Sequence, residues 1–125
     1  MSVRAATVED RPDVMNVLDG AVLAADAATV RERIRENEVF VAVSADGERV
    51  LGALVLAGTH IDAVAVRRRR RGQGIGTALV EAAADRRERL TAAFDADLRP
   101  FYEKLGFDIE PTEEAGRLWG DRRSD

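Results

Sequence analysis

The sequence has no cysteine and a single histidine among its 125 residues. The absence of cysteine excludes disulfide bonds, thiol nucleophiles and cysteine-bound zinc. One histidine argues against a histidine-based metal site, so we expect no bound metal. Aromatic residues make up only 5% of the chain. No apolar run reaches the length of a membrane span, and residues 1–4 lead into no signal-peptide core, so we expect a cytoplasmic protein with no membrane partner.

Hydrophobic residues account for 46% of the chain, which favours a globular protein over a disordered one. A length of 125 residues suits one domain, so we expect residues 1–125 to form a single unit around one core. The net charge of −4 means that the chain as a whole does not attract nucleic acid. Its positive charge is concentrated instead in five consecutive arginines, Arg67 to Arg71.

These arginines belong to a glycine-rich segment that follows an apolar strand. The segment consists of Val64, Ala65 and Val66, the five arginines, and then Gly72, Gln73, Gly74, Ile75, Gly76 and Thr77 at the start of a predicted helix. Glycine lets the chain turn sharply and lets a ligand approach the backbone closely. The first turn of a helix also offers unpaired N–H groups to an anion. The segment therefore predicts the binding of a phosphorylated ligand.

Two common phosphate-binding motifs do not fit this segment. The Walker motif ends in Gly-Lys-Ser/Thr, and no lysine stands near the loop. The dinucleotide fingerprint needs Gly-x-Gly-x-x-Gly, whereas the third glycine here, Gly76, comes one position early. A Rossmann domain would also need more βα units than 125 residues of this pattern supply.

The remaining pattern, Arg71-x-x-Gly74-x-Gly76, resembles the acyl-CoA loop of the GCN5-related N-acetyltransferase (GNAT) family. Family members often have a proline two residues past the hydrophobic end of the strand, where this chain has Arg68. The resemblance covers residues 50–110 closely and the N-terminal part more loosely.

A second motif downstream supports the resemblance. Residues 99–107 are similar to the family signature in which a short helix carries a tyrosine, here Tyr102, and ends at Gly-Phe before a strand. Pro100 suits the first turn of such a helix, and Gly106 suits the left-handed position just after its end. A packed aromatic without a catalytic role is the alternative for Tyr102, but the two motifs in the family's order favour the resemblance.

The resemblance implies transfer of an acetyl group from acetyl-CoA to a primary amine, by direct attack with both substrates bound. It implies that the amides of Arg71–Thr77 hold the pyrophosphate and that the strand end, Val64–Val66, pairs with the pantetheine arm. Tyr102 is the expected catalytic acid, because a phenol can protonate or stabilise the leaving thiolate. Seven residues before the tyrosine, where the family commonly has asparagine, stands Asp95, whose ionised carboxylate cannot donate a hydrogen bond.

The attacking amine must lose a proton, and two residues upstream of the valines are candidates for accepting it. His60 and Asp62 alternate with Val64 and Val66 along one predicted strand, so we expect all four side chains on one face of the sheet. Histidine titrates near neutral pH, which suits a catalytic base. A surface position without a catalytic role is the alternative for both candidates.

The hydrophobic spacing predicts the element order strand, two helices, three strands, helix, strand, helix, strand, with a small final strand. The expected strands are 3–6, 39–44, 50–56, 60–66, 90–94, 107–109 and 117–119. The expected helices are one with apolar positions Val14, Val17, Leu18, Ala21 and Val22, and others at 27–37, 74–89 and around Tyr102. This order matches the GNAT fold, so we expect an α/β protein with a curved mixed sheet and helices on both faces.

Two other interpretations of the same residues stay open. A module that binds or senses acyl-CoA without catalysis would keep the loop but show no turnover. A nucleic-acid-binding protein would use the arginine run, yet such proteins interleave aromatics with their basic residues, and here the aromatics lie elsewhere. We therefore expect no nucleic acid. The acceptor stays open between an amine-bearing small molecule and a peptide or protein, and homodimers are common among similar proteins.

Overall fold

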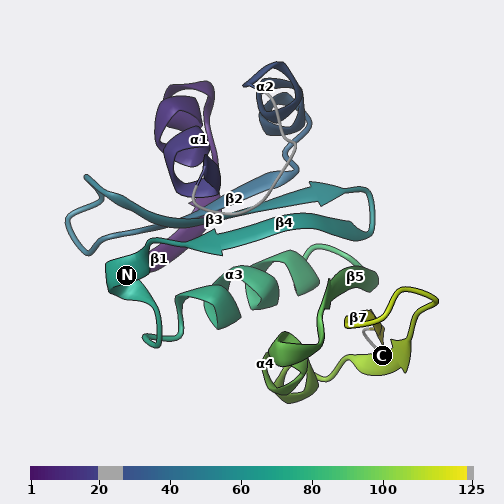
Figure 1. Ribbon diagram of the computed structural model, residues 1–125. Helices are drawn as coiled ribbons and strands as arrows, with labels where there is room; N and C mark the ends of the chain where they lie inside the picture. Colours follow the sequence, from purple (N-terminus) through teal and green to yellow (C-terminus); the bar gives the residue numbers. More distant parts are fainter. Residues whose placement is uncertain (20–26, 124–125) are drawn as a thin grey trace.

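The computed structural model describes residues 1–19 and 27–123 (Figure 1). Its strands are β1 (Ser2–Ala5), β2 (Val39–Val43), β3 (Val50–Ala57), β4 (His60–Val66), β5 (Arg89–Asp95), β6 (Asp108–Pro111) and β7 (Arg117–Arg123). Its helices are α1 (Arg11–Asp19), α2 (Ala27–Arg35), α3 (Ile75–Ala84) and α4 (Arg99–Lys104), with short 3-10 helices η1 (Val8–Asp10), η2 (Arg68–Arg70) and η3 (Ala96–Leu98). Two positions of the first predicted helix, Ala21 and Val22, lie outside the described residues. None of the helices in the described part is long and apolar enough to cross a membrane.

The described residues form a seven-stranded sheet in the order β1-β2-β3-β4-β5-β7-β6. Neighbouring strands are antiparallel except β4 and β5, which are parallel and joined through α3. Such a parallel pair needs a crossover, and a helix usually provides it. Helices α1 and α2 cover one face of the sheet, and α3 and α4 cover the other (Figure 1). The predicted α/β fold with a mixed sheet and helices on both faces is confirmed.

Apolar side chains form a cluster on each face of this sheet. On the side of α3 and α4, Leu54 and Leu79 are fully buried. On the side of α1 and α2, Val30 and Val41 are fully buried. The central strand β3 contributes to both clusters, which explains why its apolar residues form a continuous run instead of an alternating pattern.

Helix α2 ends earlier than the predicted boundary at residue 37. Asn37 takes a left-handed φ of 59°, a conformation that asparagine tolerates better than most residues. The N–H of Asn37 donates to the Ile34 carbonyl at 3.1 Å, and the N–H of Glu38 donates to the Arg33 carbonyl at 2.9 Å. This is the Schellman arrangement that terminates helices. The asparagine therefore ends the helix at Arg35.

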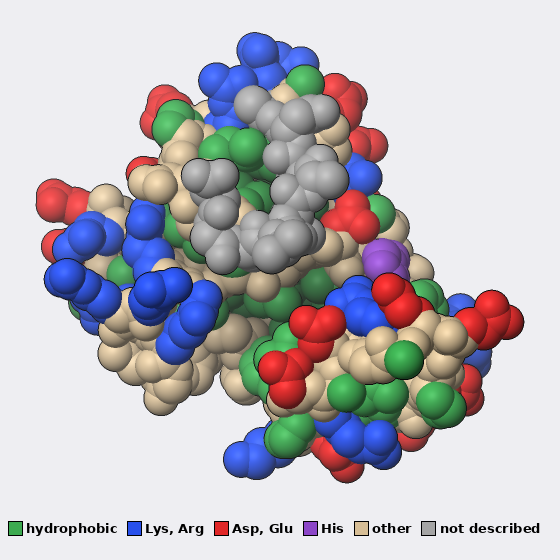
Figure 2. Space-filling model, viewed as in Figure 1, with side chains coloured by type: hydrophobic (Ala, Val, Ile, Leu, Met, Phe, Trp, Pro, Cys, Tyr) green, Lys and Arg blue, Asp and Glu red, His purple; other side chains and the backbone are tan. Residues whose placement is uncertain are grey.

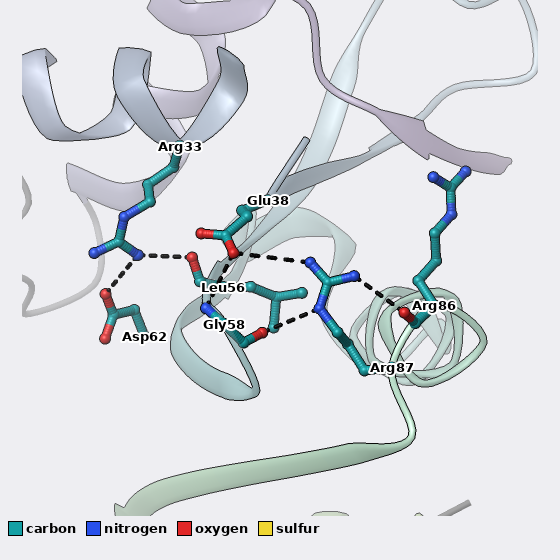
Figure 3. Close-up of polar contacts among 7 residues, drawn as sticks. All are labelled: Arg33, Glu38, Leu56, Gly58, Asp62, Arg86 and Arg87. Carbon is teal, nitrogen blue, oxygen red and sulfur yellow. Dashed lines mark hydrogen bonds and ion pairs between the residues drawn. The ribbon is translucent and has the colours of Figure 1, made fainter. Parts of the chain in front are cut away.

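Helix α3 ends at Ala84, so the prediction of a helix continuing to residue 89 is wrong. The following residues contact the β3–β4 turn instead (Figure 3). The Arg87 Nε donates to the Gly58 carbonyl at 3.1 Å, and an Arg87 guanidinium nitrogen lies 3.8 Å from a Glu38 carboxylate oxygen. The Gly58 N–H donates to the same oxygen at 3.0 Å. Contacts with residues far away in the sequence thus replace the last predicted helical turn.

The start of α1 is tied to β1 by one carboxylate. The Arg4 guanidinium donates to both oxygens of Asp10, at 2.6 and 3.0 Å, and the Thr7 N–H donates to the same carboxylate at 2.8 Å. The hydrogen bond from Arg4 lowers the pKa of Asp10 below its usual value, and burial opposes this shift. The ionised form is therefore the one that the fold stabilises.

Replacing this carboxylate is expected to weaken the fold mainly at neutral pH. Asp10→Asn should lower the free energy of unfolding by about 1 kcal/mol at pH 7. A lowered pKa contributes stability above the unfolded-state pKa of about 4 and loses it as pH falls through the folded-state pKa, so the difference should shrink at pH 3. Urea denaturation at both pH values measures this, with Glu113→Gln in the exposed β6–β7 turn as the control. An equal difference at pH 7 and pH 3 would contradict the assignment.

Candidate functional site

Strands β4 and β5 separate after a short contact. They pair only at the first two residues of β4, whereas β4 stays paired with β3 as far as Val66. The Arg67 N–H donates to the Leu51 carbonyl of β3 at 2.9 Å. Because alternate residues of an antiparallel strand direct their main-chain groups to opposite sides, those of Val64 and Val66 face away from β3. The end of β4 therefore directs main-chain donors and acceptors into the gap beside β5.

The pairing between β3 and β4 contains a bulge at Asp62. Val55 lies opposite Ala63, and the next residue, Leu56, lies opposite Ile61, so Asp62 has no direct partner on β3. An extra residue of this kind shifts the alternation of side chains between the two faces of the sheet. Side chains on the two sides of the bulge therefore do not follow the simple alternation that the sequence predicts.

The expectation that Asp62 shares a face with Val64 and Val66 is wrong for this reason. Both valines pack against the cluster under α3. The Asp62 carboxylate instead accepts a hydrogen bond of 3.1 Å from Arg33 on α2, on the opposite face (Figure 3). The same Arg33 nitrogen donates to the Leu56 carbonyl at 2.6 Å, so one guanidinium ties α2 to the bulge.

His60 also lies on the face opposite the two valines. Its Nδ1 is 2.9 Å from the Thr91 Oγ1, and its ring stacks on Trp119 with centroids 5.5 Å apart. Leu90 and Ala92 point into the cluster under α3, so Thr91 between them points to the other face. The structure thus gives His60 a hydroxyl and an indole as neighbours.

The glycine loop begins after η2 and leads into α3. Gly72 and Gly74 have φ angles of 78° and 80°, in the left-handed region that favours glycine. The Gly74 carbonyl accepts a hydrogen bond of 3.0 Å from the Ala78 N–H. The first N–H groups of a helix have no partner within it, so they face out from its N-terminus together with the positive end of the helix dipole. The loop therefore presents several N–H groups to an anion.

Tyr102 on α4 is surrounded by aromatic rings and is only 3% exposed. It stacks on Phe94 with centroids 3.9 Å apart and meets Phe101 and Phe107 edge to face at 5.0 and 5.2 Å. Desolvation on burial raises the pKa of Tyr102 to about 12, so its hydroxyl stays protonated at neutral pH. Gly106 takes the left-handed φ of 83° expected after the end of α4.

One cavity of about 670 Å³, named here the glycine-loop cavity, brings these parts together. Its lining consists of Val64, Ala65, Val66, Arg70, Arg71, Gly72, Gly74, Ile75, Gly76, Thr77, Leu98, Phe101 and Tyr102. The lining thus includes nearly all the predicted cofactor-binding residues and the predicted catalytic tyrosine. Gln73 is outside it and lines a separate hollow beside Asp46. His60 and Asp62 are also outside the lining.

Sequence reasoning missed the apolar wall of this cavity, which Leu98 and Phe101 provide. Leu98 lies on η3 and is 46% exposed. The signal available in the sequence is a leucine directly before the predicted aromatic helix. Phe101 also packs closely on Gly76, where an added Cβ would lie 3.3 Å from the Phe101 ring. Helices α3 and α4 can approach each other closely at the cavity because Gly76 has no side chain.

The surface is hollowed between a basic region and a lobe that carries charges of both signs. Figure 2 shows basic side chains on one side of the hollow, acidic and basic side chains together on the lobe below it, and apolar side chains at its floor. Together with the main-chain groups of β4 that face away from β3 and the N–H groups of the loop, this arrangement fits an extended ligand with an apolar arm, amide groups and a phosphate end.

The family model described as acetyltransferase (GNAT) domain matches residues 16–118. No curated protein gives a significant sequence match. Among solved structures, a protein from Mycobacterium tuberculosis in complex with CoA and NLQ superposes with a TM-score of 0.83 at 20% identity, covering 99% of both chains.

Two further solved structures share this fold. The ribosomal-protein-alanine N-acetyltransferase from Brucella melitensis has a TM-score of 0.76 at 21% identity, covering 99% of this chain and all (100%) of that chain. The N-acetylglutamate synthase from Neisseria gonorrhoeae, complexed with coenzyme A and L-arginine, has a TM-score of 0.76 at 17% identity, covering 98% of this chain and 32% of that one. At these identities the likeness shows the fold.

Proposed function

Because the chain belongs to the GNAT acetyltransferase family, we propose that it is an N-acetyltransferase that transfers an acetyl group from acetyl-CoA to a primary amine. The observation that carries this proposal is the glycine-loop cavity, in which the open end of β4, the loop and Tyr102 meet. The coenzyme A bound in two of the similar structures supports the choice of acyl donor.

In this proposal the backbone N–H groups from Arg71 to Thr77 bind the pyrophosphate of the donor, and the dipole of α3 favours its charge. The main-chain groups of the strand end, Val64–Val66, pair with the amides of the pantetheine arm. Leu98 and Phe101 shield the arm from water. These residues hold the thioester end of the donor near Tyr102.

The acetyl-CoA substrate supplies an activated acetyl group on a thioester sulfur. The amine nitrogen forms the new C–N bond, the C–S bond breaks, and the sulfur leaves with the bonding electrons. The Val64 N–H polarises the thioester carbonyl, because negative charge builds on that oxygen during attack. Tyr102 donates a hydrogen bond to the leaving sulfur. Since its pKa of about 12 lies above the value of about 8.5 for an ordinary thiol, it stabilises the thiolate without giving up its proton completely.

His60 is our first candidate for accepting the proton of the amine, because the Asp62 carboxylate is engaged by Arg33. We expect His60→Ala to remove the acid-side ionisation step from the pH profile of kcat/KM, and Asp62→Asn to keep it. Steady-state rates from pH 5 to pH 9 measure both. If the step survives in His60→Ala and disappears in Asp62→Asn, the role belongs to Asp62.

The proposal as a whole is tested by measuring binding and turnover separately. Calorimetric titration should show saturable binding of acetyl-CoA, and release of free thiol should exceed the hydrolysis background with at least one primary amine. Binding without thiol release across a broad amine panel would favour the module that binds acyl-CoA without catalysis. Absence of binding would overturn the proposal.

A further inference from the structure

The rings of His60 and Trp119 stack, although the two residues lie on strands that are not neighbours in the sheet. The ring planes are 16° apart and the centroids 5.5 Å apart. Trp119 is on β7, and β5 lies between β7 and β4. The next residue, Gly120, faces Phe94 and Phe107 under α4, so Trp119 points to the other face of the sheet. The indole therefore meets the imidazole above β5, on the face of α1 and α2.

Thr91 of β5 completes the surroundings of the imidazole. It pairs directly with His60 in the short parallel contact between β4 and β5, and it is only 6% exposed. Its Oγ1 lies 2.9 Å from the His60 Nδ1. Among the hydrogen bonds of the described residues, the His60 ring takes part in this one alone, through Nδ1. The ring is thus held at one nitrogen and on one face, and Nε2 is left for a substrate.

The position of His60 in the sheet suits a group that acts on the acceptor amine. Strands β4 and β5 pair only at His60 and Ile61 and separate beyond them. With the pyrophosphate at the glycine loop, the thioester end of the donor points toward this joined end of the gap. His60 lies on the face of α1 and α2, whereas Tyr102 lies on the face of α4. The amine can therefore lose its proton on one face while the sulfur leaves on the other.

Building on the function proposed above, in which His60 accepts the proton of the amine, we propose that Thr91 and Trp119 are positioning residues for this base. The Thr91 Oγ1 accepts a hydrogen bond from the protonated Nδ1 of His60, which leaves the lone pair on Nε2. Trp119 stabilises the positive charge of the ring once it is protonated, because a cation within about 6 Å of an indole face is attracted to it.

The proton transfer is balanced within this arrangement. The amine gives one proton to the His60 Nε2, and the electron pair left on the amine nitrogen forms the C–N bond. The imidazolium still donates from Nδ1 to Thr91, and it returns the proton from Nε2 to water before the next turnover. If the Thr91 hydroxyl donated to Nδ1 instead, the proton of the neutral ring would sit on Nε2, and that nitrogen could not accept another.

The charged groups around His60 are largely matched with each other. Asp62, two residues along β4, is paired with Arg33 of α2. Asp121 of β7, opposite Thr91, is paired with Arg89. The other charged residues that the register places on this face of β5, β7 and β6 are Asp95 and Arg117, which pair with each other, and Arg123, Asp108 and Glu110. Since the two flanking carboxylates are already paired, the hydroxyl and the indole are the contacts that set the state of the ring.

The first arm of the test is NMR of the free protein with ¹⁵N-labelled histidine. The chain has one histidine, so the ring signals come from His60 alone. We expect the neutral ring to carry its proton on Nδ1. Thr91→Val should shift the neutral ring toward the form protonated on Nε2 and move its titration midpoint to lower pH, and Thr91→Ser should restore both. Trp119→Leu should lower the midpoint by about half a pH unit.

The second arm measures thiol release from pH 5 to pH 9 with the same variants. Thr91→Val should lower kcat/KM about tenfold at pH 7 and keep the Kd for acetyl-CoA within twofold. The acid-side step of the profile should move with the midpoint found by NMR, and Thr91→Ser should recover the rate. Thr59→Val, at an exposed position of the β3–β4 turn, is the matched control and should change none of these values.

A neutral ring protonated on Nε2 in the unmodified protein would overturn the proposal. So would a Thr91→Val variant with unchanged kcat/KM, or one whose lost rate Thr91→Ser fails to recover. A Trp119→Leu variant with an unchanged midpoint would remove the indole from the proposal. If the unmodified protein binds no acetyl-CoA or releases no thiol, the proposed function itself fails, which is a different result from turnover that does not depend on Thr91.

Discussion

Tyr102→Phe is expected to lower kcat by about 100-fold and to leave the Kd for acetyl-CoA within twofold. The substitution keeps the ring that stacks on Phe94 and removes only the hydroxyl proposed to stabilise the leaving sulfur. Because the ring packing is retained, the thermal midpoint should change little. Since burial raises the pKa of Tyr102 to about 12, the unmodified protein should show no loss of rate from tyrosine ionisation below about pH 11.

The measurement combines steady-state kinetics with calorimetric titration of acetyl-CoA. Glu103→Gln, next to the tyrosine on the exposed side of α4, is the control and should retain full kcat. An unchanged kcat for Tyr102→Phe would remove the tyrosine from the mechanism. A tenfold rise in Kd at unchanged kcat would reassign it to donor binding.

Gly74→Val is expected to raise the Kd for acetyl-CoA by about 100-fold. Gly74 has a φ of 80°, which a β-branched residue strongly disfavours, so valine would force the loop into another course. The N–H groups at the start of α3 would then no longer converge on the pyrophosphate. Loss of two charge-assisted hydrogen bonds, at roughly 1.5 kcal/mol each, corresponds to about 100-fold in affinity.

The chain offers a matched control for the strain that this substitution introduces. Gly47, in the β2–β3 turn, has a φ of 76°, and neither glycine has an atom within 4 Å of an added Cβ. Gly47→Val should therefore lower the free energy of unfolding by a similar amount, measured in urea, while keeping the Kd for acetyl-CoA within twofold. Equal Kd values for both variants and the unmodified protein would show that the loop geometry does not determine donor binding.

The features that could be predicted from the sequence are those set by neighbouring residues. Pro100 and Gly106 define the two ends of α4 within a few positions, which explains why this helix was found. The glycine loop could be predicted for the same reason, because its glycines and the start of α3 are adjacent in the sequence. These local signals sufficed to identify most of the residues that line the glycine-loop cavity.

The features that escaped prediction depend on segments far apart in the chain. The bulge at Asp62 arises from the register of β4 against β3, and no property of the β4 sequence alone shows it. That bulge is why His60 and Asp62 lie on the other face from Val64. The length of β7 and its position between β5 and β6 likewise follow from pairing across the sheet. The cavity lined by Asn16, Val17, Arg49 and the five loop arginines brings together α1, the start of β3 and the loop, so no linear pattern predicts it.

The outermost strands of the sheet bear on how the protein behaves at high concentration. β1 and β6 contain four residues each, with Arg4 on one and Asp108, Glu110 and Pro111 on the other. Short borders that carry charges and a proline are poor templates for strand addition by a second molecule. Both edge strands therefore disfavour the strand addition by which fibrils grow. This matters because the interior strands β2 and β3 are as apolar as aggregation-prone segments.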